Sequence, residues 1–546
     1  MTVHITTVHT KPFGDQQPGT SGLRRPVATF RKRHYLENYL QSIFGAVREK
    51  GRESLVIGGD GRFFNREAIQ TCIKMATASG YERLIIGREG LLSTPAASHL
   101  IRKRSASGGV IFTASHNPGG EDGDFGVKYN AANGGPASDQ INRAIEELSR
   151  TLAAYRIVDT PDVDLNRLGS FMLGNTIIEI VDPVADYAAL MESLFDFDEL
   201  GELFEKNEFR MRFDAMHAIT GPYARTIFED RLGAPAGSVV NAVPSPDFGG
   251  GKPDPNLARA RDLVGHMFAS SAPDFGAASD GDGDRNMILG RNIFVTPSDS
   301  LAILAANMQL APGYGDGPVG VARSMPTSRA LDYVAEELGI PCFETPTGWK
   351  YFGNLLDAGM VTLCGEESFG TGSNHMREKD GLWAVLLWLT ILAKRRQPVA
   401  RIVQDHWRKY GRHYYSRHDY DAVETDAALS LMQSLRERAK TLLGQTPGGA
   451  RALAAEDFSY TDPVDQSVAE HQGVRLSLEG GARIVYRLSG TASAASTLRV
   501  YLELYEPRAD MQDRDTQSVL EHLAETASDL AGIPARLGRS RPSVIT

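Results

Sequence analysis

Apolar runs that alternate with amphipathic stretches predict an α/β unit near the start of the chain. Strands are expected at Ser54–Gly59, Arg83–Gly87 and Gly109–Thr113, and a helical spacing of apolar residues runs through Glu67–Ser79. Short apolar runs bounded by turn residues are typical of buried strands, and longer amphipathic runs are typical of helices. Strands that alternate with helices form a mostly parallel sheet.

The same order of elements occurs twice more along the chain. The strands expected in these two units are Phe209–Phe213, Ser238–Ala242, Phe275–Ala278, Val319–Ala322, Pro341–Glu344 and Met360–Cys364. In every unit a polar or Gly-rich segment follows a strand directly. Because open α/β sheets bind ligands beyond the carboxyl ends of their strands, three such edges that converge would form one cleft.

The pattern changes from about Gly411. A helix is expected at Asp426–Leu443, and alternating apolar residues predict a hairpin of Val474–Leu478 and Arg483–Leu488. A further strand, Arg499–Tyr505, and a helix, Thr516–Leu530, complete the pattern. These elements indicate an α+β domain on an antiparallel sheet.

The predicted fold is therefore three similar α/β domains with mixed, mostly parallel sheets, followed by a C-terminal α+β domain. A chain of 546 residues is too long for one hydrophobic core. The predicted domains are 1–188, 189–302, 303–408 and 409–546, and each of them carries one of the polar segments described below.

Composition narrows the class of protein. The apolar fraction of 42%, the charged fraction of 23% and the net charge of -10 describe a soluble globular protein without a broad nucleic-acid-binding surface. Cys72, Cys342 and Cys364 show no CxxC spacing, which favours a reducing compartment. Met1–Lys11 has no apolar signal region, and the longest apolar run, Leu382–Ala393, is too short to span a bilayer and predicts a buried helix. We expect a cytoplasmic protein without a membrane partner.

Thr113–Pro118 places a serine, Ser115, on a tight turn after a buried strand. The imidazole of His116 adjoins it, and Lys128 follows a short way on. A covalent phosphoryl carrier needs such a hydroxyl, together with cationic groups that offset the phosphate charge. The alternative is an Asn-Pro turn with a capping serine, which the segment alone leaves open.

Three aspartates alternate with glycines after a strand of the second unit. Asp280, Asp282 and Asp284 can point at one hard cation because the glycines let the backbone curl. An EF-hand is excluded, since its sixth and twelfth positions would be Arg285 and Arg291 instead of Gly and Glu. A solvated acidic turn is the alternative. Mg²⁺ suits a site of few protein ligands that is shared with a phosphoryl oxygen.

Two more segments end strands with polar groups. Gly365–Gly370 pairs two glutamates with a serine, which suits hydrogen bonds to sugar hydroxyls but is also typical of a helix N-terminus. Arg487–Ser493 and the following Arg499 combine hydroxyls, amides and two arginines. That set could hold a phosphate or could be a polar hairpin loop.

Together these segments resemble the α-D-phosphohexomutase superfamily, and within it the long phosphoglucomutases of eukaryotic type. The resemblance runs almost end to end. The segments that carry it are Pro18–Arg24, Thr113–Asn117, Asp280–Arg285, Thr345–Lys350, Gly365–Gly370 and Val544–Thr546. The family has four domains around a deep central cleft, which agrees with the repeat.

The resemblance implies a role for each segment. Ser115 would be a phosphoserine, and Mg²⁺ would be held by Asp280, Asp282, Asp284 and a phosphoryl oxygen on Ser115. The reaction centre would be lined by Arg24, His116, Lys128 and Arg285. The sugar would be bound by Thr347, Gly348, Glu366, Ser368 and Lys379. The non-reacting phosphate would be bound by Arg487, Ser489, Gly490, Thr491 and Arg499. Further cleft contacts would come from Thr20, Ser21 and Arg323.

The implied reaction is the reversible interconversion of α-D-glucose 1-phosphate and D-glucose 6-phosphate, in two phosphoryl transfers. Phospho-Ser115 would form glucose 1,6-bisphosphate, which is both intermediate and activator and must turn around before its other phosphoryl group returns to Ser115. Lys128 is the candidate acceptor of the hydroxyl proton, and a hinge near Tyr410–Gly411 would allow the turn. The chain departs from the family in the phosphate loop, which usually has Gly in place of Ala492 and again near Ala495. The departure matters because Ala tolerates a positive φ poorly.

Two rival interpretations come from the same superfamily. A phosphomannomutase or a glucose 1,6-bisphosphate synthase would share most of these segments, but Phe369-Gly370 after Ser368 favours glucose. A non-catalytic scaffold protein would not need to keep Ser115 and the three aspartates. The expected partner is a small phosphosugar, and the expected state is a monomer or a weak dimer.

Overall fold

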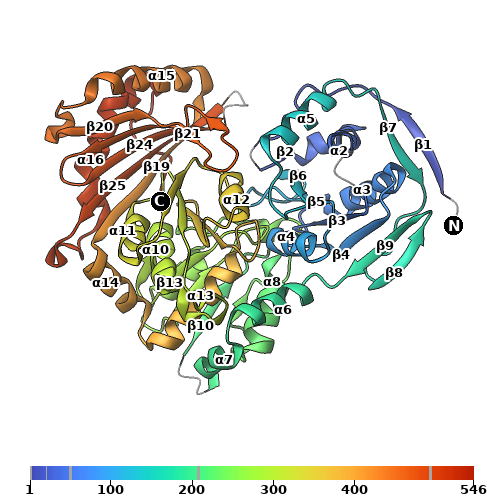
Figure 1. Ribbon diagram of the computed structural model, residues 1–546, viewed down its shortest axis with the longest axis horizontal. Coiled ribbons are helices and arrows are strands. Elements are labelled where there is room, and N and C mark those ends of the chain that lie inside the picture. The colour runs from blue at the N-terminus through green and yellow to red at the C-terminus, as the bar shows by residue number, and fades with distance from the viewer. Residues whose placement is uncertain (1–2, 20, 48–51, 206–208, 491–494) are drawn as a thin grey trace.

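The computed structural model describes all residues except 1–2, 20, 48–51, 206–208 and 491–494. It folds into four domains in chain order, with the N-terminal domain on the right of Figure 1 and the C-terminal domain at the upper left. The first three domains carry mixed sheets flanked by helices, and the fourth carries an antiparallel sheet. The predicted fold class is confirmed.

The N-terminal domain contains most of its strands in one sheet. Its strands are β1 (His4–His9), β2 (Leu23–Pro26), β3 (Ser54–Gly59), β4 (Arg83–Leu91), β5 (Gly108–Phe112), β6 (Asp124–Ala131), β7 (Ala154–Asp159), β8 (Gly169–Leu173) and β9 (Thr176–Val181). Its helices are α1 (Val27–Phe30), α2 (Tyr35–Ala46), α3 (Asn65–Ser79), α4 (Thr94–Lys103) and α5 (Asp139–Ser149). The sheet has the order β2-β6-β5-β3-β4-β9-β8, while β1 pairs with β7.

The second and third domains have smaller sheets. Their strands are β10 (Met211–Asp214), β11 (Val239–Val240), β12 (Phe275–Ala278), β13 (Met287–Gly290), β14 (Ile293–Val295), β15 (Val321–Ser324), β16 (Cys342–Thr345), β17 (Leu363–Glu366) and β18 (Gly370–Ser373). The helices are α6 (Ala185–Leu194), α7 (Phe197–Glu205), α8 (Thr220–Ala224), α9 (Arg261–Met267), α10 (Pro297–Asn307), α11 (Ala330–Leu338), α12 (Lys350–Asp357), α13 (Gly381–Arg395) and α14 (Val399–Tyr410).

One strand arrangement recurs in the three sheets. In each, three neighbouring strands are parallel, in the orders β4-β3-β5, β11-β10-β12 and β16-β15-β17. The last strand of each set is followed by an antiparallel neighbour, β6, β13 or β18. The repeat predicted from the sequence is thus confirmed, and the turn after that last parallel strand is an equivalent position in all three domains.

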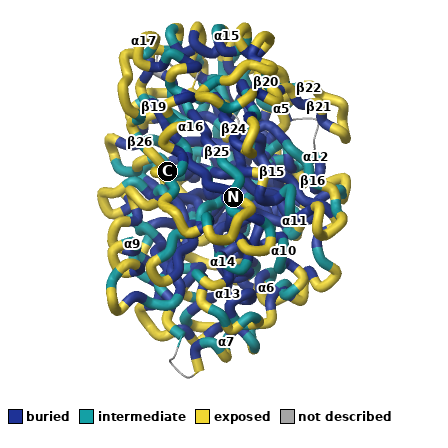
Figure 2. Tube along the Cα trace, turned by 90° about the vertical axis from the view of Figure 1, so that its left-hand side faces the viewer, coloured by how far each residue is buried: buried dark blue, intermediate teal, exposed yellow. Residues whose placement is uncertain are grey.

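The fourth domain is built on a six-stranded antiparallel sheet. Its elements are β19 (Arg412–Glu424), α15 (Thr425–Leu442), β20 (Ala452–Asp457), β23 (Val474–Leu478), β24 (Ala482–Ser489), β25 (Ala495–Glu506), α16 (Thr516–Ala531), α17 (Ile533–Leu537) and β26 (Val544–Ile545). The strand order is β20-β23-β24-β25-β19-β26, and a short pair, β21 (Tyr460–Thr461) and β22 (Val468–Ala469), stands apart. In Figure 2 the tube is buried along β24 and β25 and exposed on the outer loops.

Local sequence explains why the site-bearing helices begin where they do. The Ser93 hydroxyl accepts a hydrogen bond from the Ala96 N–H and caps α4, which has Pro95 in its first turn. Asp380 caps α13 in the same way, through the Trp383 N–H. Most of α13 is buried, so the prediction of a core helix at Leu382–Ala393 is confirmed.

Two elements were not expected from the sequence. The helical segment after β10 consists of α8 followed by a π-helix, Arg225–Arg231. The thirteen-residue strand β19 was not predicted at all. A bulge between Tyr420 and Val423 interrupts its pairing with β25, which breaks the alternation that reveals a strand.

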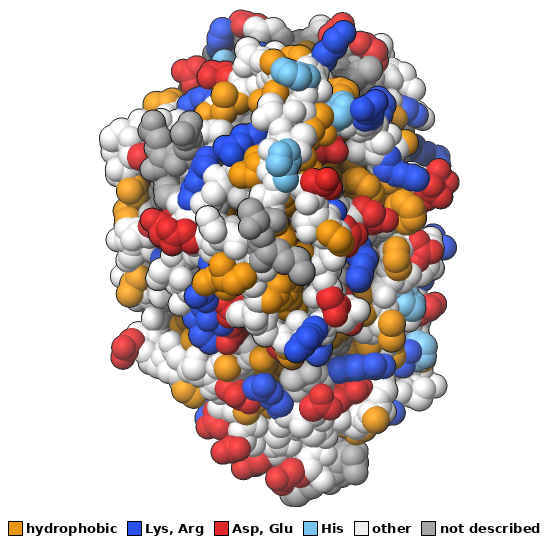
Figure 3. All heavy atoms as spheres, turned by 90° about the vertical axis from the view of Figure 1, so that its right-hand side faces the viewer, with side chains coloured by type: hydrophobic (Ala, Val, Ile, Leu, Met, Phe, Trp, Pro, Cys, Tyr) orange, Lys and Arg blue, Asp and Glu red, His pale blue; other side chains and the backbone are white. Residues whose placement is uncertain are grey.

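Surface charge is mixed on the face formed by the N-terminal domain, where acidic and basic side chains are interspersed (Figure 3). Within the part of the chain that the structure describes, no helix combines the length and apolarity that crossing a membrane requires.

Candidate active site

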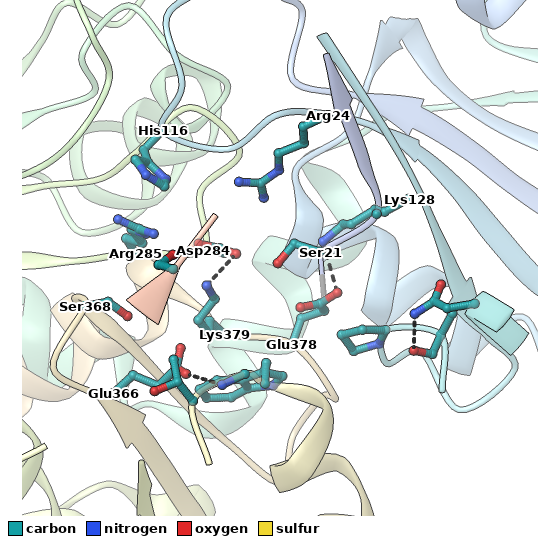
Figure 4. Close-up of a pocket in the computed structure, with 18 of the residues that line it drawn as sticks. Ser21, Arg24, His116, Lys128, Asp284, Arg285, Glu366, Ser368, Glu378 and Lys379 are labelled. Atoms are coloured by element: carbon teal, nitrogen blue, oxygen red, sulfur yellow. Dashed lines mark hydrogen bonds and ion pairs between the residues drawn. The ribbon is translucent and has the colours of Figure 1, made fainter. Parts of the chain in front are cut away.

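One cavity is lined by residues from all four domains (Figure 4). The predicted site residues among them are Ser21, Arg24, His116, Lys128, Asp284, Arg285, Thr347, Gly348, Glu366, Ser368, Lys379, Arg487, Ser489 and Arg499. Arg24 and His116 lie on one side, Glu366 lies on the opposite side, and Lys379 lies between them. The net-negative chain therefore gathers positive charge inside this cavity.

The three equivalent turns hold the three strongest sequence motifs. Ser115 follows β5, Asp280 follows β12, and Glu366 ends β17. Backbone hydrogen bonds tie the aspartate turn to both other domains: the Thr94 N–H, which follows β4, donates to the Asp282 carbonyl, and the Asn286 N–H donates to the Phe369 carbonyl of the turn after β17. Convergence of the three strand edges, which the sequence left conditional, is thus a feature of the structure.

Ser115 is buried and has a left-handed backbone with a φ of 52°. Its hydroxyl donates to Oδ2 of Asp280 at 2.8 Å, and its N–H donates to the Thr113 hydroxyl at 2.8 Å. Its carbonyl accepts from Nη2 of Arg62 at 2.7 Å, and Arg62 forms a fully buried ion pair with Asp60 at 2.8 Å. This bracing fixes an otherwise strained residue, a pattern typical of functional sites.

The three aspartates of the second domain form a compact, buried cluster. One carboxylate oxygen from each of Asp280, Asp282 and Asp284 lies within 4.8 Å of the others. Oδ1 of Asp280 accepts from the N–H groups of Asp284 and Arg285, and Oδ2 of Asp282 accepts from the Thr94 hydroxyl. Oδ1 of Asp282 and Oδ1 of Asp284 are buried without a hydrogen-bond partner. Buried carboxylate oxygens that have no hydrogen-bond partner are suitable ligands for a hard divalent cation.

The electrostatics of the cluster support the same interpretation. Burial, and then the charges of Asp284 and Asp282, raise the pKa of Asp280 well above its usual range. Like charges held together in this way repel unless a cation lies between them. Lys379, whose Nζ lies 3.1 Å from Oδ2 of Asp284, offsets part of that repulsion.

The imidazole of His116 adjoins the hydroxyl of Ser115 and lies among cationic groups. Nδ1 of His116 lies 3.3 Å from this hydroxyl oxygen. Burial, together with the charges of Arg285 and Arg24, lowers the pKa of His116 well below its usual range, so its imidazole is neutral. The positive charge on this side of the cavity is therefore carried by the two arginines.

The sugar-loop residues lie opposite. Oε1 of Glu366 accepts a hydrogen bond from the Gly348 N–H at 2.9 Å. This bond joins the segment Gly365–Gly370 to the turn after β16. Burial raises the pKa of Glu366, while the Lys379 charge opposes that effect. Thr347 and Ser368 add hydroxyl groups to the same wall.

The arginines of the fourth domain face one another across two strands. Arg487 on β24 pairs in register with Arg499 on β25, so both side chains lie on the same face of the sheet, together with the cavity-lining Ser489. Gly490 has a φ of 78°, which favours glycine. Thr491 and Ala492, as well as Thr20 of the first domain, lie outside the described residues.

Arg323 was expected in the cleft, but it is not among the described residues that line the cavity. Its guanidinium donates to both carboxylate oxygens of Asp332, at 2.5 and 2.8 Å, and to Oε1 of Glu344 at 2.8 Å. The physical reason is that a fully paired, buried arginine on β15 cannot also project toward a ligand.

Several residues at the site were not predicted. They are Gly22, Tyr129, Pro136, Ala137, Asn142, Trp349 and Glu378, which line the cavity, and Asp254, which pairs with Arg285 at 3.4 Å. Three of them had a signal in the sequence: Gly22 and Trp349 lie in the family-like segments Pro18–Arg24 and Thr345–Lys350, and Glu378 adjoins the predicted Lys379.

Comparisons with known proteins agree with this geometry. Three family models described as phosphoglucomutase/phosphomannomutase α/β/α domains I, II and III match residues 15–156, 185–292 and 297–410, and a phosphoglucomutase-1 C-terminal domain matches 412–543. A phosphoglucomutase of Rhizobium radiobacter is 57% identical over 542 residues, which cover 99% of this chain and 100% of the relative. A chloroplastic phosphoglucomutase of Solanum tuberosum is 51% identical, covering 99% of this chain and 88% of its own.

A solved structure is similar over the whole length. The open form of the exocytosis-sensitive phosphoprotein parafusin, a phosphoglucomutase from Paramecium, matches with a TM-score of 0.92 and 45% identity and covers 100% of both chains. Relatives include proteins named cytoplasmic as well as chloroplastic.

Proposed function

Because this chain belongs to the phosphoglucomutase/phosphomannomutase family and shares the isomerase activity of its full-length relatives, the interconversion of α-D-glucose 1-phosphate and D-glucose 6-phosphate, we propose that it works through a phosphorylated Ser115. The observation that carries the proposal is the buried Ser115 hydroxyl, 2.8 Å from the Asp280 carboxylate and beside a cavity rich in cations. Such surroundings suit a covalent phosphoryl carrier.

The proposed cycle contains two transfers through one site. A sugar hydroxyl attacks the phosphorus on Ser115, the bond from phosphorus to Oγ breaks, the hydroxyl proton passes to Oγ, and glucose 1,6-bisphosphate forms. After this intermediate has turned around, Oγ attacks its other phosphorus, the bond from that phosphorus to the sugar oxygen breaks, the Oγ proton passes to this oxygen, and the product sugar phosphate leaves. Positioning and electrostatic stabilisation supply most of the catalysis in such transfers.

Arg24, Lys128 and Arg285 would stabilise the charge on the transferring phosphoryl group. The sequence also suggests Lys128 as the acceptor of the hydroxyl proton. Its Nζ lies 3.0 Å from Oε1 of Glu378 in a buried ion pair, and we therefore propose the role of a fixed cation for Lys128 instead.

Mg²⁺ is the proposed cofactor, held by Asp280, Asp282 and Asp284. The two unpartnered oxygens of this cluster fit the ion. When bound, Mg²⁺ would supply a Lewis acid that offsets charge on the phosphoryl oxygens. The Thr94 hydroxyl and the Lys379 amine orient two of the three carboxylates for that purpose.

Glu366 and Ser368, with Thr347, Gly348 and Lys379, would bind the sugar, and the arginine pair on β24 and β25 would bind the non-reacting phosphate. A hinge at Tyr410–Gly411 would let the fourth domain move during the turn of the intermediate. Gly411 has a φ of 84°, and a side chain there would lie 2.2 Å from the Tyr505 ring. Only glycine fits this joint.

Further proposals concern the domain limits, the oligomeric state and the partners of the protein. We propose the domain limits 1–188, 189–302, 303–408 and 409–546, a monomer or weak dimer, and no nucleic-acid or membrane partner. The described cysteines are all free, which supports a reducing compartment such as the cytoplasm.

The test is a coupled assay of glucose 6-phosphate formation from glucose 1-phosphate, with Mg²⁺ and a trace of glucose 1,6-bisphosphate. Mass spectrometry of the purified protein is expected to find phosphate on the peptide that contains Ser115. Activity with phosphate only on another residue would overturn the proposal.

The arginine pair proposed to bind the non-reacting phosphate, Arg487 and Arg499, gives a separate prediction. Arg487→Met is expected to raise the KM for glucose 1-phosphate about 10- to 100-fold, because a hydrogen bond to a charged group contributes about 1.5–3 kcal/mol. Initial rates across substrate concentrations measure this. An unchanged KM would place the phosphate elsewhere.

A further prediction concerns Gly281, where the backbone of the aspartate turn lies close to the backbone of the serine turn. A Cβ at Gly281 would lie 2.3 Å from the Ser115 carbonyl, so Gly281→Ala must push the aspartate loop away from the serine. We expect kcat to fall about 100-fold, the effect of a displacement near 1 Å. Gly265→Ala is the matched control, because nothing lies within 4 Å of a Cβ there. Equal kcat values for the two variants would contradict this account.

A further inference from the structure

The loop between β18 and α13 joins the third domain to two others. Oε1 of Glu378 accepts from Nζ of Lys128 at 3.0 Å and from Nδ2 of Asn130 at 2.9 Å, and both of these residues lie on β6 of the first domain. The next residue, Lys379, contacts Asp284 of the second domain at 3.1 Å. Two successive side chains therefore fix this loop to strand β6 of the first domain and to the aspartate turn of the second.

The contact between Glu378 and Lys128 is buried and lies at the cavity wall. The side chains are 2% and 9% exposed, and both line the cavity (Figure 4). Burial raises the pKa of Glu378, whereas the Lys128 charge opposes that effect. A buried carboxylate is costly without a partner, so each member of the pair depends on the other for its position.

The charge of Lys128 acts on the reaction centre. Lys128 lines the same cavity as Arg24, His116 and Arg285, the residues expected at the reaction centre. Its backbone is also held closely, because a Cβ at Gly22 would lie 2.7 Å from the Lys128 Cβ. The strand thus fixes the base of the lysine, while the far end of its side chain is held by Glu378.

We propose that Glu378 is a positioning residue for phosphoryl transfer, which holds the Lys128 ammonium against the cavity and sets the first domain in register with the third. This inference rests on the proposed function, since it assigns Lys128 to the charge of the transferring phosphoryl group. Asn130 supports it by donating to the same oxygen and, at 2.9 Å, to the Gly134 carbonyl.

The test is a double-mutant cycle with Glu378→Gln and Lys128→Met. Glu378→Gln keeps the shape and an oxygen acceptor but removes the charge, and kcat is expected to fall about 10- to 100-fold, the range for outer-shell partners, with little change in KM. If Glu378 acts through Lys128, adding Glu378→Gln to Lys128→Met changes kcat little further. Effects on kcat that multiply in the double variant would overturn the proposal.

Two controls separate positioning from a general loss of structure. Asp139→Asn removes the 2.6 Å ion pair with Lys350, which also joins the first and third domains but involves no described residue of the cavity lining, and its kcat should match wild type. A kcat loss in Asp139→Asn as large as that in Glu378→Gln would overturn the proposal. Thermal melting verifies folding, and if Glu378→Gln does not fold, Glu378→Asp enters the same cycle.

Failure of this inference can be told apart from failure of the proposed function. Activity that survives Ser115→Ala would refute the phosphoserine cycle, whatever happens at Glu378. Activity that needs Ser115 but shows independent effects of Glu378 and Lys128 would refute only the positioning role.

Discussion

Ser115→Ala is expected to lower kcat for glucose 6-phosphate formation by about 10⁴-fold or more, the scale of loss when an enzyme nucleophile is removed. The alanine variant has no oxygen that could carry the phosphoryl group between the two transfers. The remaining cations of the cavity would still bind the substrate, so the KM, where it can be measured, should change far less. Coupled-assay initial rates at saturating Mg²⁺ provide the measurement.

Ser42→Ala is the matched control for this substitution. Ser42 is another buried serine of the first domain, and its hydroxyl donates to the Asn38 carbonyl within α2. The loss of one hydrogen bond there should cost about 1 kcal/mol of stability and leave kcat unchanged. If Ser115→Ala and Ser42→Ala showed the same kcat, the phosphoserine would have to be a different residue.

Elements with strong local signals were the ones that the sequence predicted well. The predicted strand Ser54–Gly59 has the observed bounds of β3, because an apolar run ends there at a glycine turn. The hairpin of β23 and β24 was found from alternation and its Gly-Gly turn. Both predictions rest on patterns of residues that are close together in the sequence.

Interactions between domains explain what the sequence could not reveal. Glu378 is paired with Lys128 across 250 positions, and no local pattern records such a contact. Arg323 lies near the end of the parallel strand β15, as cavity residues lie near the ends of theirs, but its side chain is bound to Asp332 on the following helix and does not line the cavity. A residue type at a strand end thus indicates the edge of the sheet, and its partners decide whether it faces the ligand.

Removal of the divalent cation is expected to have the second of the two largest effects. Treatment with a chelator should lower activity about 10³-fold or more, because a Lewis acid contributes several kcal/mol to charge stabilisation. Added Mg²⁺ should restore the rate. The same ion should raise the melting temperature, since a ligand at 100 times its Kd stabilises the folded state by about 2.7 kcal/mol.

Asp282→Asn distinguishes this site from any other place where Mg²⁺ could act. Its Oδ1 is buried and unpartnered, so the substitution removes a ligand and one negative charge of the cluster. We expect the variant to lose activity and the Mg²⁺-dependent rise in melting temperature. Asp262→Asn, an exposed aspartate of the same domain, should behave as wild type in both respects. An undiminished Mg²⁺-dependent stabilisation of Asp282→Asn would show that the three aspartates do not hold the ion.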